Sequence, residues 1–201
     1  MEVQFFLLII LLSLLSVCNG KYLLAGLLTG LLVGVRPDGL VWAGVLGIPL
    51  LFNFRRFIRY ALGVLIVLAP MIIALTWYYG SPLPYSIVAK RASYGVYIAH
   101  DFANLIKVLS IFLPTLMMDH SGLILFIWSF FLAAVVISIY TAIKKGDKRV
   151  VPPALFVILY PAFIWAGRTE TFRWYGFITI PALIITVFYA FNAIVEFLRN
   201  K

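Results

Sequence analysis

Long runs of apolar residues fill most of the chain, and short polar segments separate one run from the next. The runs cover residues 5–17, 22–35, 40–52, 60–79, 123–143, 150–166 and 175–198. A membrane span needs about 20 predominantly apolar residues, a length that the runs at 60–79, 123–143 and 175–198 reach. The first three runs hold only 13 or 14 residues, so we expect them to be short, tilted or packed inside a bundle. No run alternates like a membrane β-strand, and the pattern predicts an all-α, polytopic transmembrane helical bundle of about seven spans.

The segment of residues 94–118 predicts a different kind of helix. His100-Asp101, Asn104 and Lys107 follow one another at three- to four-residue spacing among apolar neighbours. This spacing places the polar side chains on one helical face. We therefore expect one amphipathic helix that lies along the membrane interface rather than across the bilayer.

The first 20 residues share an apolar run with cleavable signal peptides. Glu2 precedes this run and no Lys or Arg does, which is the wrong charge for a signal peptide. We therefore predict a retained membrane helix, with cleavage as the alternative.

The composition is that of a membrane protein. Hydrophobic residues make up 64% of the 201 residues and charged residues 11%, whereas soluble domains carry about 25% charged residues. A soluble domain of this length could not bury so much apolar surface, which excludes a soluble enzyme and a disordered chain. The length favours a single transmembrane domain over residues 1–201. The single cysteine, Cys18, excludes an intrachain disulfide and a cysteine-based metal cluster.

The net charge of +9 predicts an orientation in the membrane and no nucleic-acid partner. Basic residues gather in segments 54–59, 144–149 and 199–201, each beside an apolar run. Positive charge collects on the cytoplasmic side of membrane proteins, so these segments and the C-terminus are predicted to be cytoplasmic. The outer face then carries Glu2 and residues 36–39, 80–97 and 167–174.

Arg36-Pro37-Asp38-Gly39 interrupts an apolar hairpin on the predicted outer face. Charged groups at membrane depth are costly, about 2.5–3.5 kcal/mol each on insertion scales. One interpretation is a Pro-Gly turn in which Arg36 pairs with Asp38 or with lipid headgroups. The other is a phosphate clamp, because the planar guanidinium suits phosphate oxygens, with Asp38 orienting Arg36 or a sugar hydroxyl.

Two further outer segments carry basic and aromatic residues. Lys90 follows a Gly- and Pro-rich loop, and it either reaches to lipid headgroups or binds a lipid-linked phosphate. Arg173 is either part of a solvated loop with an aromatic belt or turns towards the same site as Lys90, with Trp174 and Tyr175 stacking on a sugar ring. His and Asp at 100–101 and 119–120 lack tight metal-ligand spacing, so we predict no metal and no other cofactor.

Three groups of short motifs follow one another along the chain. The first is Met1-Glu2 before an apolar run, then Leu24–Gly30 and Arg36-Pro37-Asp38-Gly39-Leu40. The second is Tyr79-Gly80-Ser81-Pro82-Leu83-Pro84, with Ala89-Lys90 after it. The third is Phe172-Arg173-Trp174-Tyr175, with Pro181 further on. In order and spacing they resemble integral-membrane glycosyltransferases of the GT-C superfamily, such as protein mannosyltransferases and aminoarabinose transferases.

The resemblance implies an enzyme that takes a polyprenyl-phosphate-linked sugar as donor and acts on the extracytoplasmic face. Arg36, Lys90 and Arg173 would then line the donor phosphate region, and Glu2 would lie near the site. The residues implied to line the sugar or acceptor are Tyr79, Tyr85, Trp174 and Tyr175. Transfer would be inverting: a carboxylate deprotonates the acceptor hydroxyl while cationic side chains hold the leaving phosphate.

The motifs leave the catalytic base unknown. The family's catalytic Asp lies upstream of the Met-Glu stretch, which implies that this chain is the C-terminal part of a longer enzyme and does not transfer sugar alone. Glu2 and Asp38 are the remaining candidates, but Glu2 lies at a chain end that is free to fray and Asp38 is neutralised by neighbouring Arg36. Tyr85 also stands where the family usually has Asn.

Two other functions remain open on the sequence. A transporter or lipid-flipping component would need a basic cavity for a headgroup, although corresponding interrupted helices in two halves of the chain are not evident. A non-catalytic membrane subunit would support a partner chain.

Overall fold

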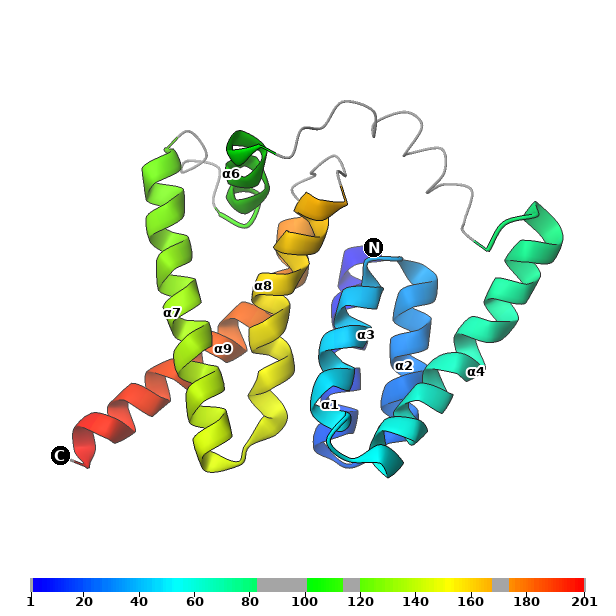
Figure 1. Ribbon diagram of the computed structural model, residues 1–201, viewed down its shortest axis with the longest axis horizontal. Coiled ribbons are helices and arrows are strands. Elements are labelled where there is room, and N and C mark those ends of the chain that lie inside the picture. The colour runs from blue at the N-terminus through cyan, green and yellow to red at the C-terminus, as the bar shows by residue number, and fades with distance from the viewer. Residues whose placement is uncertain (1, 83–100, 114–119, 168–173, 201) are drawn as a thin grey trace. The chain divides into compact units, whose positions relative to one another are not determined.

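The computed structural model describes residues 2–82, 101–113, 120–167 and 174–200, and every regular element within them is helical (Figure 1). The α-helices are α1 (Glu2–Cys18), α2 (Tyr22–Val35), α3 (Gly39–Gly47), α4 (Phe54–Tyr79), α6 (Phe102–Ser110), α7 (Ser121–Lys145), α8 (Val151–Ala166) and α9 (Trp174–Arg199), and the short 3-10 helices are η1 (Ile48–Leu50) and η3 (Lys148–Val150). They form two compact units, unit 1 with α1 to α4 and unit 2 with α6 to α9. The prediction of an all-α protein is confirmed for this part of the chain.

Four helices are long and apolar enough to cross a membrane, as expected of an integral membrane protein. They are Phe54–Tyr79, Ser121–Lys145, Lys148–Ala166 and Tyr175–Arg199. The helices before α4 have only 17, 14 and 9 residues. At 1.5 Å per residue, α3 is about 14 Å long, against a hydrocarbon core of about 30 Å. The total of seven spans therefore stays a prediction.

Helix α4 begins six residues before the apolar run that predicted it. Its first two turns contain the arginines that the sequence placed in a loop, and Asn53 caps the helix by accepting a hydrogen bond from the Arg56 N–H at 3.3 Å. Arginine is a good helix former and asparagine is a favoured N-cap. The helix therefore extends into the basic segment.

Glycines bring α2 and α4 into backbone contact in unit 1. A Cβ added to Gly26 would lie 2.0 Å from the carbonyl oxygen of Tyr60, and one added to Gly63 would lie 2.3 Å from that of Leu23. Both distances are far below van der Waals contact, so a larger residue would have to move a helix. Small residues that let helix backbones approach are typical of packing in membranes.

The same contact continues along α2 at four-residue intervals. Gly30 and Gly34 follow Gly26 on one helical face, and a Cβ added to Gly30 would lie 3.0 Å from the carbonyl oxygen of Val64. A Cβ added to Gly34 would lie 3.1 Å from the sulfur of Met71. The partner on α4 advances with the position on α2, so these two helices run parallel.

Two hydrogen bonds fix α3 to its neighbours inside unit 1. The indole Nε1–H of Trp42 donates to Ser13 Oγ of α1 at 2.8 Å, and both residues are buried. The hydroxyl of Tyr60 donates to the Ala43 carbonyl at 2.9 Å and so connects α4 to α3. The polar groups of Trp42 and Tyr60 therefore each have a partner across a helix interface.

In unit 2, α7 and α9 run parallel. The Ser138 hydroxyl of α7 donates to the Thr186 carbonyl of α9 at 2.9 Å, and Lys145 forms an ion pair with Glu196 further along both helices. Helix α8 runs back after a turn at Gly146, where φ is +70°, and packs against both α7 and α9. In this left-handed region a glycine is favoured because it has no Cβ.

Of the predicted amphipathic helix at 94–118, residues 94–100 and 114–118 lie outside the described residues, and in the part between them α6 covers only Phe102–Ser110. Asp101 caps it by accepting from the Asn104 N–H at 2.7 Å. Val108 is buried and Lys107 is exposed, which gives the helix one apolar and one polar face. It packs on α7 and α8, and Trp128 of α7 donates a hydrogen bond to its Leu109 carbonyl at 3.1 Å.

Candidate functional site

The turn between α2 and α3 is built by the four residues Arg36 to Gly39. The Arg36 N–H donates to the Leu32 carbonyl at 3.0 Å and closes α2, and the Gly39 N–H donates to the Arg36 carbonyl at 2.9 Å. A Cβ on Gly39 would lie 3.0 Å from the Leu32 carbonyl oxygen, so this residue lets α3 start against the end of α2. The turn is therefore tight, and it holds two charged side chains close together.

Arg36 and Asp38 form a two-point ion pair in this turn. Nε of Arg36 donates to Oδ1 of Asp38 at 3.0 Å and Nη2 donates to Oδ2 at 2.9 Å. The side chains are only 12% and 11% exposed. The pairing that the sequence predicted as one alternative is confirmed, whereas phosphate binding by Arg36 stays a prediction.

The aromatic ring of Phe6 lies next to the Arg36 side chain of this pair. The guanidinium carbon of Arg36 lies 5.6 Å from the ring centroid of Phe6, which is fully buried in α1. Such a cation–π contact favours one orientation of the guanidinium. Glu2 begins α1 one turn before Phe6, and positions four apart share a helical face. The side chain of Glu2 lies outside the described residues, so its place near the site stays a prediction.

The other predicted site residues lie in different units or outside the described residues, so their convergence stays a prediction. Tyr79 is the last residue of α4, and its half-exposed ring packs edge-to-face on Tyr78 with centroids 4.7 Å apart. Trp174 and Tyr175 begin α9 in unit 2. Three further predicted residues, Lys90, Tyr85 and Arg173, lie outside the described residues, as do His100 and Asp119 of the metal alternative.

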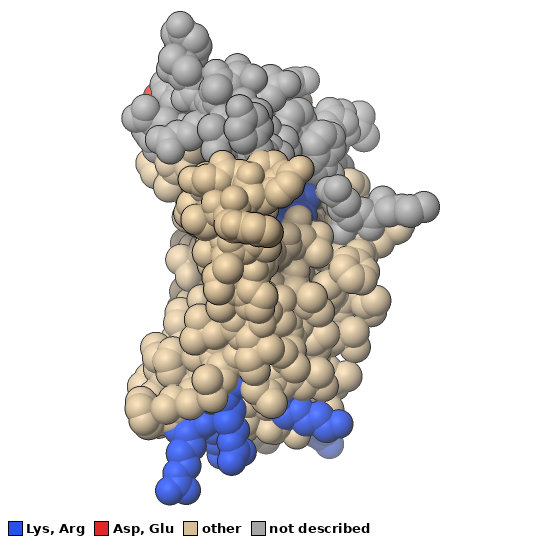
Figure 2. All heavy atoms as spheres, turned by 90° about the vertical axis from the view of Figure 1, so that its right-hand side faces the viewer, with Lys and Arg blue, Asp and Glu red and all other residues tan. Residues whose placement is uncertain are grey.

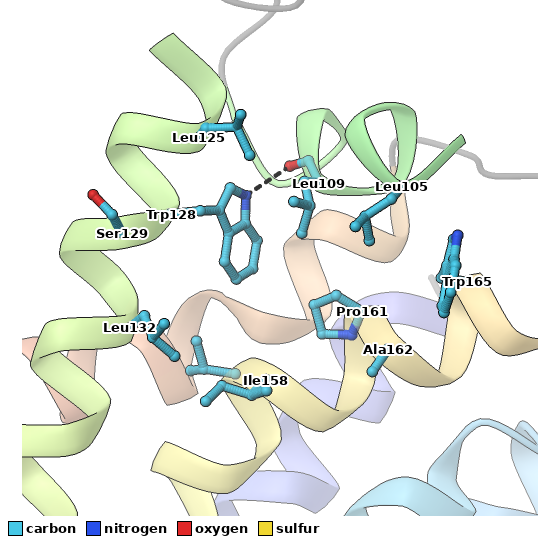
Figure 3. A pocket seen from close by; sticks show the side chains of 11 residues that line it. Leu105, Leu109, Leu125, Trp128, Ser129, Leu132, Ile158, Pro161, Ala162 and Trp165 are labelled. Carbon is cyan, nitrogen blue, oxygen red and sulfur yellow. Dashed lines mark hydrogen bonds between the residues drawn. The ribbon is translucent and has the colours of Figure 1, made fainter. Parts of the chain in front are cut away.

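Unit 2 contains an apolar groove of about 500 Å³ that the sequence did not predict (Figure 3). Helix α6 contributes Leu105 and Leu109 to its wall, α7 contributes Trp128, and α8 contributes Pro161 and Trp165. The Trp128 to Leu109 hydrogen bond joins two of the walls, as the dashed line in Figure 3 shows. The volume lies within the range of about 300–1,000 Å³ of small-molecule sites.

The lining of this groove suits hydrocarbon rather than sugar or phosphate. Among the described lining residues, Ser129 alone bears a hydroxyl, and that hydroxyl donates to the Phe126 carbonyl of its own helix at 2.6 Å. In Figure 3 the Ser129 side chain points away from the other labelled side chains. None of these described lining residues is charged. The sequence did contain an indication of this groove. Trp128 and Trp165 are bulky, Pro161 can kink a helix, and all three lie within predicted apolar runs.

The basic end of unit 2 is partly neutralised by its own carboxylates. Arg149 donates through Nε to Asp147 at 2.7 Å, and Lys145 pairs with Glu196. The hydrogen bonds from Arg149 hold the pKa of the Asp147 carboxyl below its ordinary value. The Asp147 side chain is 24% exposed and that of Arg149 is 69% exposed, so the pair lies at a solvated edge.

Comparisons of the chain with known protein families, with curated proteins and with solved structures found no match. The class of protein is therefore assigned from the fold and the candidate site. In its described part it is a helical protein with four helices long and apolar enough to cross a membrane, a largely buried Arg36–Asp38 pair in one unit and an apolar groove in the other.

Proposed function

We propose that the chain is a membrane glycosyltransferase of the GT-C type that handles a polyprenyl-phosphate-linked sugar at its extracytoplasmic face. The order and spacing of the motifs around Arg36, Lys90 and Arg173 support this proposal. So does the Arg36–Asp38 pair, which is the observation that carries it. The proposed role of Arg36 is to hold the donor phosphate, whose charge grows as the sugar leaves.

The geometry of the pair suits that role. Asp38 holds the guanidinium of Arg36 at two points, and the Phe6 ring lies beside it. A side chain already held in one orientation loses little conformational entropy when it binds. A planar guanidinium also matches the geometry of phosphate oxygens better than a lysine ammonium does. Asp38 is therefore proposed to position Arg36 rather than to act as a base.

The apolar groove of unit 2 is considered by itself. The described residues of its lining carry no charge, which suits a hydrocarbon chain such as that of a polyprenyl lipid. The described residues of this groove include no carboxylate, so they contribute no general base. The groove is proposed to bind hydrocarbon only.

Binding of a polyprenyl phosphate tests the proposal without requiring turnover. The purified protein carries Arg55→Gln/Arg56→Gln/Arg59→Gln throughout, so that the exposed arginines at the start of α4 cannot bind phosphate. In detergent it is titrated with polyprenyl phosphate and with the matching polyprenol, and the complexes are counted by native mass spectrometry. A charge-assisted contact to phosphate contributes about 1.5–3 kcal/mol. We therefore expect the phosphate to bind at least about tenfold more tightly, and the Arg36→Gln/Asp38→Asn protein to lose that preference.

The double substitution removes both charges together and avoids leaving one of them buried and unpaired. Arg199→Gln is the matched control, because Arg199 is an exposed arginine in the last turn of α9, and the preference should persist in it. A phosphate preference that is unchanged in the double variant would mean that the pair only builds the turn. The proposal would then be wrong.

A second candidate is a non-catalytic membrane subunit that binds lipid. The apolar lining of the groove favours it, since nothing in that lining activates a hydroxyl. The two candidate functions predict different results in the titration with polyprenol. A lipid-binding subunit would bind polyprenol and polyprenyl phosphate equally, and Leu109→Asp in the groove would weaken both.

A further inference from the structure

Unit 1 carries an unusual concentration of positive charge where α4 begins. We name Lys21, Arg55, Arg56 and Arg59 the α4 basic cluster, and all four side chains are exposed. The guanidinium carbon of Arg56 lies 5.5 Å from the centroid of the Tyr22 ring, so the start of α4 lies beside the turn that contains Lys21. Figure 2 shows Lys and Arg side chains gathered at one end of the face that it draws.

Within residues 2–82, the described part of unit 1, no carboxylate lies near this cluster. Residues 1–99 contain two acidic residues, Glu2 and Asp38. Glu2 lies at the far end of the 17-residue α1, about 25 Å from Lys21. Asp38 lies beyond the 14-residue α2, about 21 Å away, and it is paired with Arg36. Both distances exceed the Debye length of about 8–10 Å at physiological salt.

The basic end of unit 2 has a different arrangement. There Glu196 pairs with Lys145 and Asp147 pairs with Arg149, so carboxylates of the same unit compensate part of the charge. The preference for positive charge on the cytoplasmic side predicts that the basic segment of each unit is cytoplasmic. It does not account for a cluster that has no nearby carboxylate within residues 2–82.

Large apolar side chains lie next to the α4 basic cluster in the chain. Leu51 is 58% exposed, Phe52 is 79% exposed and Phe54 is 74% exposed. They occupy the connection that leads into α4. A partner for this surface therefore needs an anionic group for the arginines and hydrocarbon for the three apolar residues.

We propose that the α4 basic cluster, together with Leu51, Phe52 and Phe54, binds an anionic phospholipid. The headgroup phosphate would lie among the arginines, and the upper part of an acyl chain would cover the apolar side chains. Free phosphate has no apolar part to contact these residues. A zwitterionic headgroup brings its own cation, which the cluster would repel. This site is separate from the Arg36–Asp38 pair, so it can be tested on its own.

The experiment measures lipids retained by the purified protein in native mass spectrometry. The protein is exchanged into detergent with equal amounts of phosphatidylglycerol and phosphatidylcholine of matched chains. We expect at least about tenfold more phosphatidylglycerol bound at low salt, and a preference that falls as sodium chloride rises, because exposed charges are screened. Inorganic phosphate at millimolar concentration should not displace the lipid. A preference that is insensitive to salt, or displacement by phosphate, would overturn the proposal.

Matched variants separate the two parts of the surface. Arg55→Gln/Arg56→Gln/Arg59→Gln should abolish the phosphatidylglycerol preference. Lys144→Gln/Lys148→Gln/Arg199→Gln removes the same charge from unit 2 and should leave the preference intact. Phe52→Ser/Phe54→Ser should lower the retention of both lipids without changing their ratio. Equal losses in the two triple variants would show that net charge alone attracts the lipid, and the proposal would be wrong.

Discussion

Single buried polar contacts hold the helices of unit 1 in register. Trp42 is 1% exposed and Ser13 is fully buried, and their hydrogen bond of 2.8 Å connects α3 to α1. Apolar contacts between helices give little orientation in a membrane, because lipid tails are equally apolar. A buried donor that meets one acceptor therefore determines how α3 faces α1.

Trp42→Phe should destabilise the protein measurably. The substitution removes the indole donor and leaves a small cavity, which together should cost about 1–3 kcal/mol. Thermal unfolding in detergent is the measurement. Trp77→Phe is the control, since Trp77 is 89% exposed, and its midpoint should stay at the wild-type value. Equal midpoints for the two variants would argue against the hydrogen bond as a stabilising contact.

Asp147 makes the stability depend on pH. Its folded pKa is lowered by the hydrogen bonds from Arg149, so the folded state binds a proton less readily than the unfolded chain. The contribution is therefore present above the unfolded pKa of about 3.9 and is lost as pH falls through the folded pKa. Asp147→Asn should be less stable than wild type at pH 7, by no more than about 1 kcal/mol because solvent screens the pair.

The difference between Asp147→Asn and wild type should stay constant from pH 7 to about pH 4 and shrink at lower pH, which a series of unfolding midpoints extended below pH 4 would show. Arg149→Gln removes the other partner and should give the same loss at pH 7. A difference that grew on acidification would have the wrong sign for a lowered pKa.

At the scale of helices, the contact between α2 and α4 depends on the absence of side chains. Gly26→Ala places a methyl group 2.0 Å from the Tyr60 carbonyl oxygen, and overpacking of this kind costs about 1–3 kcal/mol. Gly44→Ala in α3 is the matched control, because an added Cβ there meets nothing within 4 Å. Alanine is the better helix former by about 1 kcal/mol, so the control should equal or exceed wild type in thermal midpoint.

A midpoint for Gly26→Ala at or above that of Gly44→Ala would mean that α2 and α4 can separate without cost. The result would also bear on Gly30 and Gly34, which continue the same face of α2. Sequence spacing alone identifies such a face, whereas it does not identify the helix that packs against it.

At the scale of the whole molecule, the orientation in the membrane is the prediction with the widest consequences. In unit 1 the parallel course of α2 and α4 puts their starting ends, with Tyr22 and Arg56, side by side. The predicted cytoplasmic position of the basic segments requires successive spans to cross the membrane in opposite directions. Helices α2 and α4 would then cross in the same direction, which agrees with their parallel course. The same prediction places Ser81 outside and Lys148 inside.

Cysteine labelling checks this orientation. Ser81→Cys and Lys148→Cys are made separately in a Cys18→Ser background, because Cys18 is exposed. We expect an impermeant thiol reagent to label the first in intact cells and the second only after permeabilisation. Within this basic segment Lys148 is replaced rather than Gly146, because the positive φ of Gly146 would strain a cysteine side chain there. Labelling of both positions from one side would contradict the predicted orientation.

The apolar runs determined much of the local structure by themselves. The run at 22–35 coincides with α2, and those at 123–143, 150–166 and 175–198 lie within two residues of the ends of α7, α8 and α9. A helix satisfies its own backbone hydrogen bonds, so the length and hydropathy of a run suffice to predict it. The Arg36–Asp38 pair was predictable for a related reason, since two residues in one tight turn can meet whatever the remaining fold.

Only the tertiary structure decided which helices meet and what lies between them. The Gly26–Gly63 contact, the Trp42–Ser13 hydrogen bond and the apolar groove each join residues more than 25 positions apart. One apolar side chain can pack against many others, so the sequence of an apolar run does not specify which helix it contacts. The pairing of helices depends on shape across an interface, a property that exists only once the helices have packed.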